Sequence, residues 1–158
     1  HEAYEALLAR HAVTELKDSD ALIERNGSRI RIAGITLERD QYLKGPKKPV
    51  SGAFFEKKLK HSNDFTILLM HSPAYLEEAA AWGADLTLAG HYHGGTIYVP
   101  KLGGLMTPQF VFFEKKVRGV FDYGGQRGVV SAGLGTHSVN LRVNNPPEIV
   151  ELILHAES

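Results

Sequence analysis

Residues 86–95 read LTLAGHYHGG, a short apolar run that breaks at a glycine and continues into two histidines one residue apart. The apolar part, residues 86–89, is too short for a helix and lies between Gly83 and Gly90, so it predicts a buried strand. In open α/β sheets, ligands bind outside the carboxyl ends of strands, and these histidines follow such an end. Taken alone, the pattern also fits two surface histidines in a loop.

The loop after this strand suits the binding of a ligand by side chains. On a helix, His91 and His93 would point about 200° apart, whereas in an irregular loop both imidazoles can face one cavity. Gly94 and Gly95 allow the backbone to pass close to whatever the histidines hold.

A second strand and a helix precede this stretch and complete a β-α-β unit. Residues 65–70 read FTILLM and end at His71, and residues 74–82 predict a helix that begins near Pro73 and closes at Gly83. If the two strands are parallel neighbours, His71 and His91 emerge at the same edge of the sheet. Neutral imidazoles are suitable ligands for zinc, manganese or iron.

The remaining chain predicts further local elements. Asn26-Gly27 favours a type I′ hairpin turn, and Gly124-Gly125 favours a second hairpin. The glycine-rich residues 133–137 lack the strand-then-helix context of a phosphate-binding loop. In chain order we expect a helix over 3–11, strands over 20–24 and 29–35, a loop with a basic tip over 41–51, a helix over 53–60, a loop over 96–104, strands over 118–123 and 127–132, and a buried final strand over 148–154.

Composition limits the classes of function. The 158 residues suit one domain, and 18 basic against 18 acidic residues give no electrostatic case for nucleic acid or an anionic membrane. The absence of cysteine excludes disulfides, thiolate zinc sites and a cysteine nucleophile. No apolar run approaches the ~20 residues of a transmembrane helix. The apolar residues 105–113 fit a lipid-facing lid or core, and we favour core.

The carboxylates of the chain are poorly placed for a two-metal site. Two cations about 3.5 to 4 Å apart need bridging carboxylates or hydroxide to offset their charge. Asp64 and Asp85 precede their strands, and Asp122 lies in the late hairpin. The histidines therefore supply only part of such a site.

FTILLMHSP followed by LAGHYHGG resembles the last two metal motifs of calcineurin-like metallophosphoesterases. His1-Glu2, with the helix and hairpin after it, resembles the tail of the GNH[D/E] motif of that family. VSAGLGTH and NNPPEIVELIL resemble the ending of the membrane-associated branch with GHxHGGQ. The resemblance implies an α/β fold, the C-terminal part of a two-sheet β-sandwich flanked by helices, with residues 1–158 forming the C-terminal half of one catalytic domain.

The resemblance also implies an activity and a set of roles. It implies phosphomonoesterase or phosphodiesterase activity at a binuclear metal centre with a bridging hydroxide. His71 and His91 would ligate one metal and His93 the other, with His1 as the catalytic histidine near the leaving group. The metals would be manganese, zinc or iron, and the substrate a phosphorylated small molecule or a lipid-linked phosphate.

Several family motifs have no match here, namely the D-x-H, the G-D with the bridging aspartate and the asparagine of GNH. Thr96 also stands where that branch has glutamine. We therefore expect the isolated chain to hold one metal at most and to be inactive without the missing N-terminal half. A non-catalytic metal-binding or interaction module, or pairing with a second chain that carries the motifs, stays open, as does the oligomeric state. The parent protein would be cytoplasmic or membrane-associated.

Overall fold

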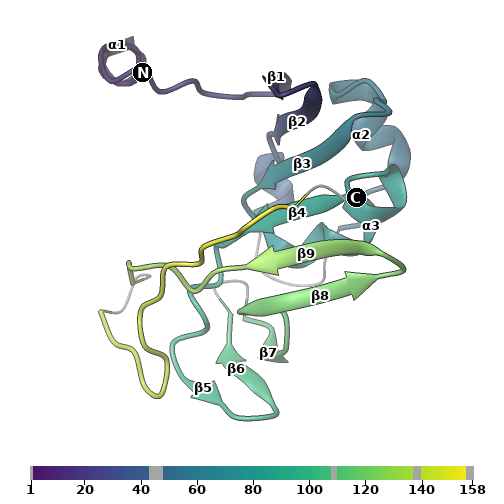
Figure 1. Cartoon of the computed structure of the whole chain (residues 1–158). Coiled ribbons are helices and arrows are strands. Elements are labelled where there is room, and N and C mark those ends of the chain that lie inside the picture. Colours follow the sequence, from purple (N-terminus) through teal and green to yellow (C-terminus); the bar gives the residue numbers. More distant parts are fainter. Residues whose placement is uncertain (1, 43–47, 108–109, 137–139, 156–158) are drawn as a thin grey trace.

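The computed structural model describes residues 2–42, 48–107, 110–136 and 140–155 (Figure 1). These residues form a six-stranded mixed sheet in the order β1-β2-β3-β4-β9-β8 and a three-stranded sheet in the order β5-β6-β7. The strands are β1 Ser19–Arg25, β2 Ser28–Ile35, β3 Phe65–Met70, β4 Leu86–Ala89, β5 Tyr98–Val99, β6 Gly103–Met106, β7 Phe112–Glu114, β8 Gly119–Tyr123 and β9 Gln126–Val130. The helices are α1 Glu2–Arg10, α2 Gly52–Lys58 and α3 Leu76–Trp82, with short 3-10 turns at Arg39–Tyr42 (η1) and Pro73–Tyr75 (η2). The predicted α/β class is therefore confirmed.

The middle of the large sheet is parallel. Strands β2, β3, β4 and β9 run in one direction, and β1 and β8 close the two sides as antiparallel hairpin partners. The parallel ladder continues past the strand ends, because Gly90 N donates to His71 O at 3.1 Å and Ser131 N donates to Ala89 O at 3.0 Å. The loops that follow β3, β4 and β9 therefore begin side by side at one edge.

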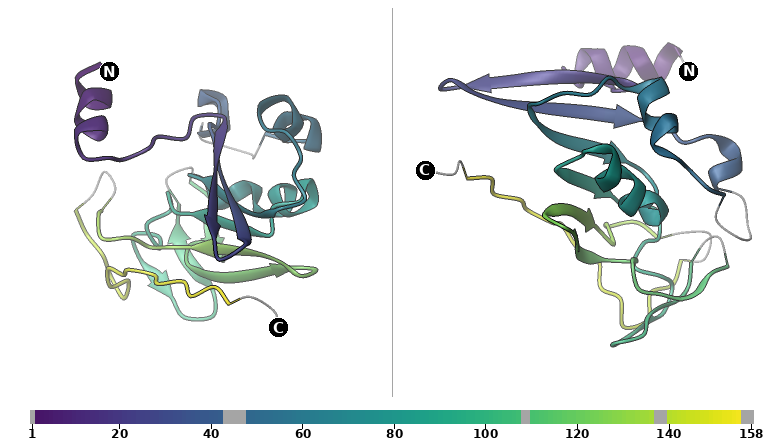
Figure 2. Two further views of the ribbon diagram at one scale, coloured as in Figure 1. Left: turned by 45° about the horizontal axis from the view of Figure 1, so that its top comes forward. Right: turned by 90° about the vertical axis from the view of Figure 1, so that its right-hand side faces the viewer.

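One face of this sheet carries the core. Helices α2 and α3 pack against each other, and α3 also contacts β4 and β9. Helix α1 stands apart from the sheets in Figure 1 and in the left view of Figure 2. Along β3, Leu68 and Met70 are buried in the core cluster, while Phe65 and Leu69 on the other face are 43% and 39% exposed. The side away from α2 and α3 is thus only partly covered by the described residues.

The local elements follow the turn chemistry of the sequence. Asn26 and Gly27 have φ of 51° and 79°, as a type I′ turn requires, and they join β1 to β2 as predicted. Gly83 ends α3 in the left-handed region with φ of 112°, and Ser72 accepts a hydrogen bond from Ala74 N at the start of η2. The predicted β-α-β unit is therefore confirmed.

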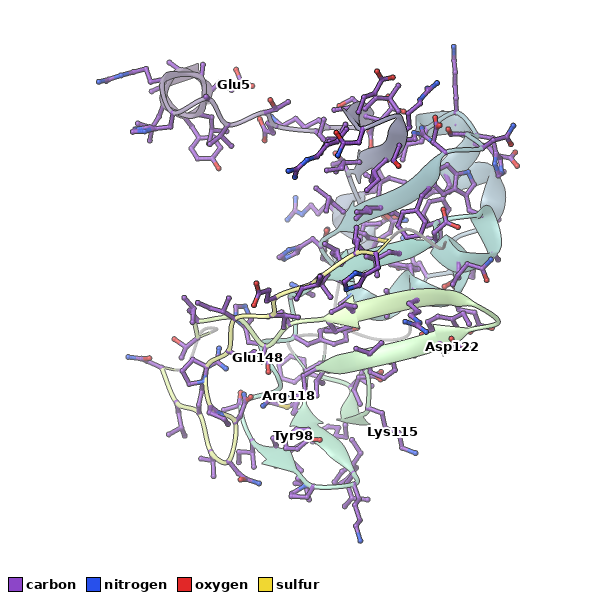
Figure 3. All side chains as sticks on the ribbon, in the orientation of Figure 1. Glu5, Tyr98, Lys115, Arg118, Asp122 and Glu148 are labelled. Carbon is purple, nitrogen blue, oxygen red and sulfur yellow. The ribbon has the colours of Figure 1, made fainter. Side chains whose placement is uncertain are left out.

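The second sheet is attached to the first through polar contacts. Figure 3 shows Arg118, Glu148 and Tyr98 close together. Arg118 pairs with Glu148 and lies 5.8 Å over the Tyr98 ring in β5, and Glu148 also accepts a hydrogen bond from Ala132 N at 2.7 Å. These contacts join β5 of the second sheet to the start of β8, the end of β9 and the residues beyond 140.

Three expectations from the sequence are wrong. The segment 96–104 is not all loop, since it contains β5 and the start of β6. Residues 148–154 form no strand, and Ile149 and Ile153 are 82% and 71% exposed, because no described strand pairs with them. Residues 105–113 are not core throughout, since Phe110 and Phe112 are 49% and 59% exposed. Pro108 and Gln109 of this segment lie outside the described residues.

The basic tip predicted after η1 is only partly observed. Gly45, Pro46 and Lys47 lie outside the described residues, and Lys48 pairs with Asp40 at 2.7 Å. In the described part of the chain, no helix combines the length and apolar character of a membrane span.

Leu68→Ala and Leu69→Ala test the assignment of the covered face. Leu68 is fully buried, so its truncation should cost about 2–5 kcal/mol, whereas truncation of the part-exposed Leu69 should cost clearly less. Urea unfolding of both variants measures the difference. Equal losses would contradict the assignment, because they would require both faces to be buried.

Candidate metal centre

The structure brings together the two histidines that follow β3 and β4. His91 Nδ1 lies 3.1 Å from His71 Nε2, and the two ring centroids are 4.7 Å apart. Two nitrogens bound to one metal at about 2.0–2.1 Å lie about 3.0 Å apart at a right angle and about 3.4 Å apart in a tetrahedron. The observed separation therefore fits either a direct hydrogen bond between the rings or a metal that both rings ligate.

An aromatic ring from η1 packs against this pair. The centroid of Tyr42 lies 5.9 Å from that of His71 and 5.2 Å from that of His91, the latter edge-on at 72°. This contact limits the rotation of both imidazoles. No sequence pattern pointed to Tyr42, because it borders a segment of breaker residues far along the chain from both motifs.

The surroundings of His71 favour its neutral form. Burial lowers the pKa of the His71 imidazole below its ordinary value, and the nearby charge of His93 lowers it further. A metal ligand must be deprotonated, so a lowered pKa leaves the imidazole available for a metal over a wider pH range.

His93 lies in the same loop, two residues after His91. Its Nδ1 lies 3.2 Å from Gly135 O. A carbonyl oxygen only accepts hydrogen bonds, so in the neutral imidazole Nδ1 carries the proton and the lone pair lies on Nε2. This is the tautomer in which metal-ligating histidines are commonly held, with the second nitrogen donating to a carbonyl or carboxylate.

Tyr92 anchors the loop between the two histidines. Its side chain is buried, and burial raises the pKa of the Tyr92 hydroxyl to about 12, with the charge of Glu114 acting in the same direction. A hydrogen bond between the hydroxyl groups of Tyr92 and Ser72 opposes the shift. Tyr92 is therefore neutral at physiological pH and fastens the loop to the residue that follows His71.

The glycines of the loop accommodate a side chain from far along the sequence. Asn145 Nδ2 donates to His93 O at 2.8 Å and to Gly95 O. Gly94 has φ of 73°, and a Cβ on it would overlap the Asn145 amide. Gly94 is thus required both by its backbone conformation and by the space that Asn145 fills.

Asp64 and Asp85 lie at the amino ends of their strands, away from the histidines, as the sequence predicted. Asp85 accepts from Thr66 N at 2.7 Å at the amino ends of the strands, and Asp64 pairs with Arg29 at 3.2 Å. Among the described residues, no group of three or more histidine, aspartate or glutamate side chains is close enough to hold a metal ion. His1, the predicted catalytic histidine, lies outside the described residues.

The amino-acid sequence of the chain is similar to those of known proteins. The chain is 30% identical over 156 residues to the uncharacterized metallophosphoesterase YkuE of Bacillus subtilis, covering 96% of this chain and 50% of that protein. The chain is therefore a metallophosphoesterase homologue. It is also 25% identical over 143 residues to the uncharacterized metallophosphoesterase YkoQ of the same organism, covering 90% of this chain and 50% of that protein.

A third metallophosphoesterase, from Aquifex aeolicus, is 33% identical over 87 residues, which cover 54% of this chain and 31% of that protein. The chain spans about half the length of the two Bacillus relatives. No protein-family model and no solved structure matches it. The predicted resemblance to metallophosphoesterases is confirmed, while the membrane-associated branch stays a prediction.

Gly94→Ala tests the fit between the loop and Asn145. Gly133→Ala is a matched control, since Gly133 also has a positive φ, of 61°, but a Cβ there meets nothing within 4 Å. Both variants lose stability through the left-handed backbone, and Gly94→Ala should lose about 1–3 kcal/mol more through the clash. Chemical denaturation measures both. Equal losses would contradict the close fit at Gly94.

His93→Gln tests the electrostatic coupling within the candidate centre. The substitution removes the charge that helps to lower the pKa of His71, so that pKa should rise but stay below its ordinary value because burial persists. NMR titration of the metal-free protein measures the shift, with His155→Gln as a control. An unchanged or lower His71 pKa in His93→Gln would contradict the coupling.

Proposed function

We propose that this chain carries the histidine side of a binuclear metal centre that hydrolyses phosphoesters. The observation that supports this most is the 3.1 Å separation of His91 Nδ1 and His71 Nε2 at the carboxyl ends of two adjoining parallel strands. Such strand ends are the usual place for ligand sites in α/β sheets. The similarity to metallophosphoesterases supports the same activity.

Each histidine takes one role in the proposal. His71 and His91 hold one divalent metal, and His93 offers Nε2 to the other. His1 acts near the leaving oxygen, a role taken from the motif resemblance alone. Two divalent cations bound in this way supply Lewis-acid activation and stabilise charge on the phosphoryl oxygens.

Contacts with neighbouring residues restrict the orientation and the tautomer of the histidine rings, which favours metal binding. Tyr42 restricts the two imidazoles of the close pair, and Gly135 O holds the proton of His93 on Nδ1. Imidazole ligands suit manganese, zinc or iron, and we propose one of these metals.

The proposal requires carboxylates that the described residues do not place at the histidines. Two cations at close range repel each other unless anionic ligands bridge them. We therefore propose that the bridging carboxylates come from a part of the protein outside these 158 residues. This chain alone should hold one metal weakly and show no turnover.

A phosphorylated small molecule or a lipid-linked phosphate, as monoester or diester, is the proposed substrate. A second candidate function is a non-catalytic metal-binding module. It is favoured by the fact that, among the described residues, no group of three or more histidine, aspartate or glutamate side chains is close enough to hold a metal ion.

His71→Ala and His91→Ala in the full-length protein test the proposal. Each variant should lower manganese affinity and hydrolysis of p-nitrophenyl phosphate or bis(p-nitrophenyl) phosphate at least about 100-fold, because each removes a ligand that fixes the metal. His155→Ala is the control, since His155 lies on the exposed segment beyond the sheet. Calorimetric titration and a chromogenic assay give the two readouts.

Two results would contradict the proposal in different ways. Unchanged metal affinity in both variants would show that His71 and His91 are not ligands. Tight metal binding by the full-length wild-type protein, without hydrolysis of either ester, would favour the non-catalytic module.

A further inference from the structure

We propose that Asn145 is a positioning residue that holds His93 in the orientation needed for its metal. The inference rests on the proposed function, since it concerns the metal on the His93 side of the centre. It assigns a role to a side chain that lies 52 residues beyond the histidine it serves.

The histidine loop has a backbone that needs external support. His91, His93, Gly94 and Gly95 all have positive φ, at 64°, 48°, 73° and 73°. Residues other than glycine adopt this region at a cost in free energy, so such a conformation persists only where its surroundings enforce it. The loop makes two short-range backbone hydrogen bonds of its own, from Tyr92 N to Gly90 O and from Gly95 N to Tyr92 O, both at 2.7 Å.

Asn145 supplies further support from outside the loop. Its side chain is 2% exposed, and Nδ2 donates to His93 O at 2.8 Å and to Gly95 O. These two carbonyls lie on either side of Gly94, whose missing Cβ leaves the room for the amide. Because Nδ2 has two hydrogens, the amide can hold both carbonyls and fix the backbone of His93 from one point.

The same distant segment also orients the imidazole of His93. Arg142 Nη2 donates to Ala132 O at 2.9 Å, to Gly133 O at 3.1 Å and to Gly135 O. Gly135 O is the atom that lies 3.2 Å from His93 Nδ1. Arg142 therefore fixes the acceptor of the imidazole proton, while Asn145 fixes the backbone that carries the ring.

The segment that carries these two side chains is itself attached to the sheet region. Val143 N donates to Thr96 O and Tyr98 N donates to Val143 O, both at 3.0 Å. Residues 142–145 thus lie against the start of the second sheet and provide a fixed support on which His93 is held.

Different contacts hold the histidines on the two sides of the proposed centre. His71 and His91 are placed by the strand ends, through the bond from Gly90 N to His71 O, and by packing against Tyr42. His93 depends on Asn145 in addition. Loss of the Asn145 donors should therefore disturb the His93 side and leave the His71–His91 side in place.

Asn145→Leu and Asn145→Asp in the full-length protein test this inference. Leucine keeps most of the volume without a donor, and aspartate keeps the shape but replaces the donor with a carboxylate oxygen. The negative charge of aspartate would by itself strengthen cation binding, so a weaker metal site in that variant reports the lost donors.

Asn144→Gly is the matched control. Asn144 precedes Asn145 and is exposed, and its Nδ2 donates to Tyr98 O at 3.1 Å. Its φ of 51° lies in a region that glycine adopts without strain. This variant removes a side-chain hydrogen bond of the same segment without touching the histidine loop.

Two measurements separate a positioning role from a purely structural one. In the metal-free protein, long-range ¹H–¹⁵N NMR should find His93 protonated at Nδ1 in the wild type and in Asn144→Gly, and a mixture of tautomers in both Asn145 variants. Manganese titration followed by EPR should find two sites in the wild type. The Asn145 variants should lose about 10–100-fold in affinity at one site and less than about threefold at the other.

The outcomes that overturn the inference are distinct from those that overturn the proposed function. Wild-type tautomers and affinities in both Asn145 variants would show that Asn145 does not position His93. Equal weakening at both sites would show a general effect on the fold. If the wild type binds none of manganese, zinc and iron in calorimetric titrations, the proposed function fails, and the tautomer measurement still decides the role of Asn145.

Discussion

The hydrogen bond from Gly90 N to His71 O is the contact on which the candidate centre depends. It continues the parallel ladder of β3 and β4 by one step beyond the last strand residues, so the two chains leave the sheet in register. That register brings His71 Nε2 and His91 Nδ1 to 3.1 Å, a separation compatible with a shared metal. Packing of α3 against β4 and β9, the buried Leu68 and the left-handed Gly83 all keep these strands adjacent.

A cluster of imidazoles without carboxylates has limited chemistry. Neutral nitrogens bind a divalent cation without compensating its charge, and a second cation nearby would raise the electrostatic cost further. The acidic residues Asp64 and Asp85 are engaged at the opposite ends of the strands. In the proposed centre this chain would supply the nitrogen ligands, and the anionic groups would have to come from elsewhere. The chain spans about half the length of its two Bacillus relatives.

The sequence predicted the parts of the fold that local rules determine. The Asn26-Gly27 hairpin, the β-α-β unit and the Gly124-Gly125 hairpin depend on turn residues and short-range periodicity, and each is confirmed. The prediction that His71 and His91 lie at the same edge of the sheet rested on the same rules. The contacts of Tyr42 and Asn145 with the histidine residues were not predicted. Both residues lie far along the chain from the histidines, in segments with no periodic pattern. The prediction of a buried strand over the apolar residues 148–154 was wrong. A strand is buried only where a neighbouring strand or helix covers it, and no described strand pairs with this segment.

The proposed centre requires that His71 and His91 share one metal ion. Anomalous scattering at the manganese absorption edge, from crystals of the full-length protein grown with manganese, tests it most directly. We expect a peak about 2.1 Å from both His91 Nδ1 and His71 Nε2, with the second peak on the side of His93 Nε2. A peak bound to neither His71 nor His91, while the two rings stay hydrogen-bonded to each other, would contradict it.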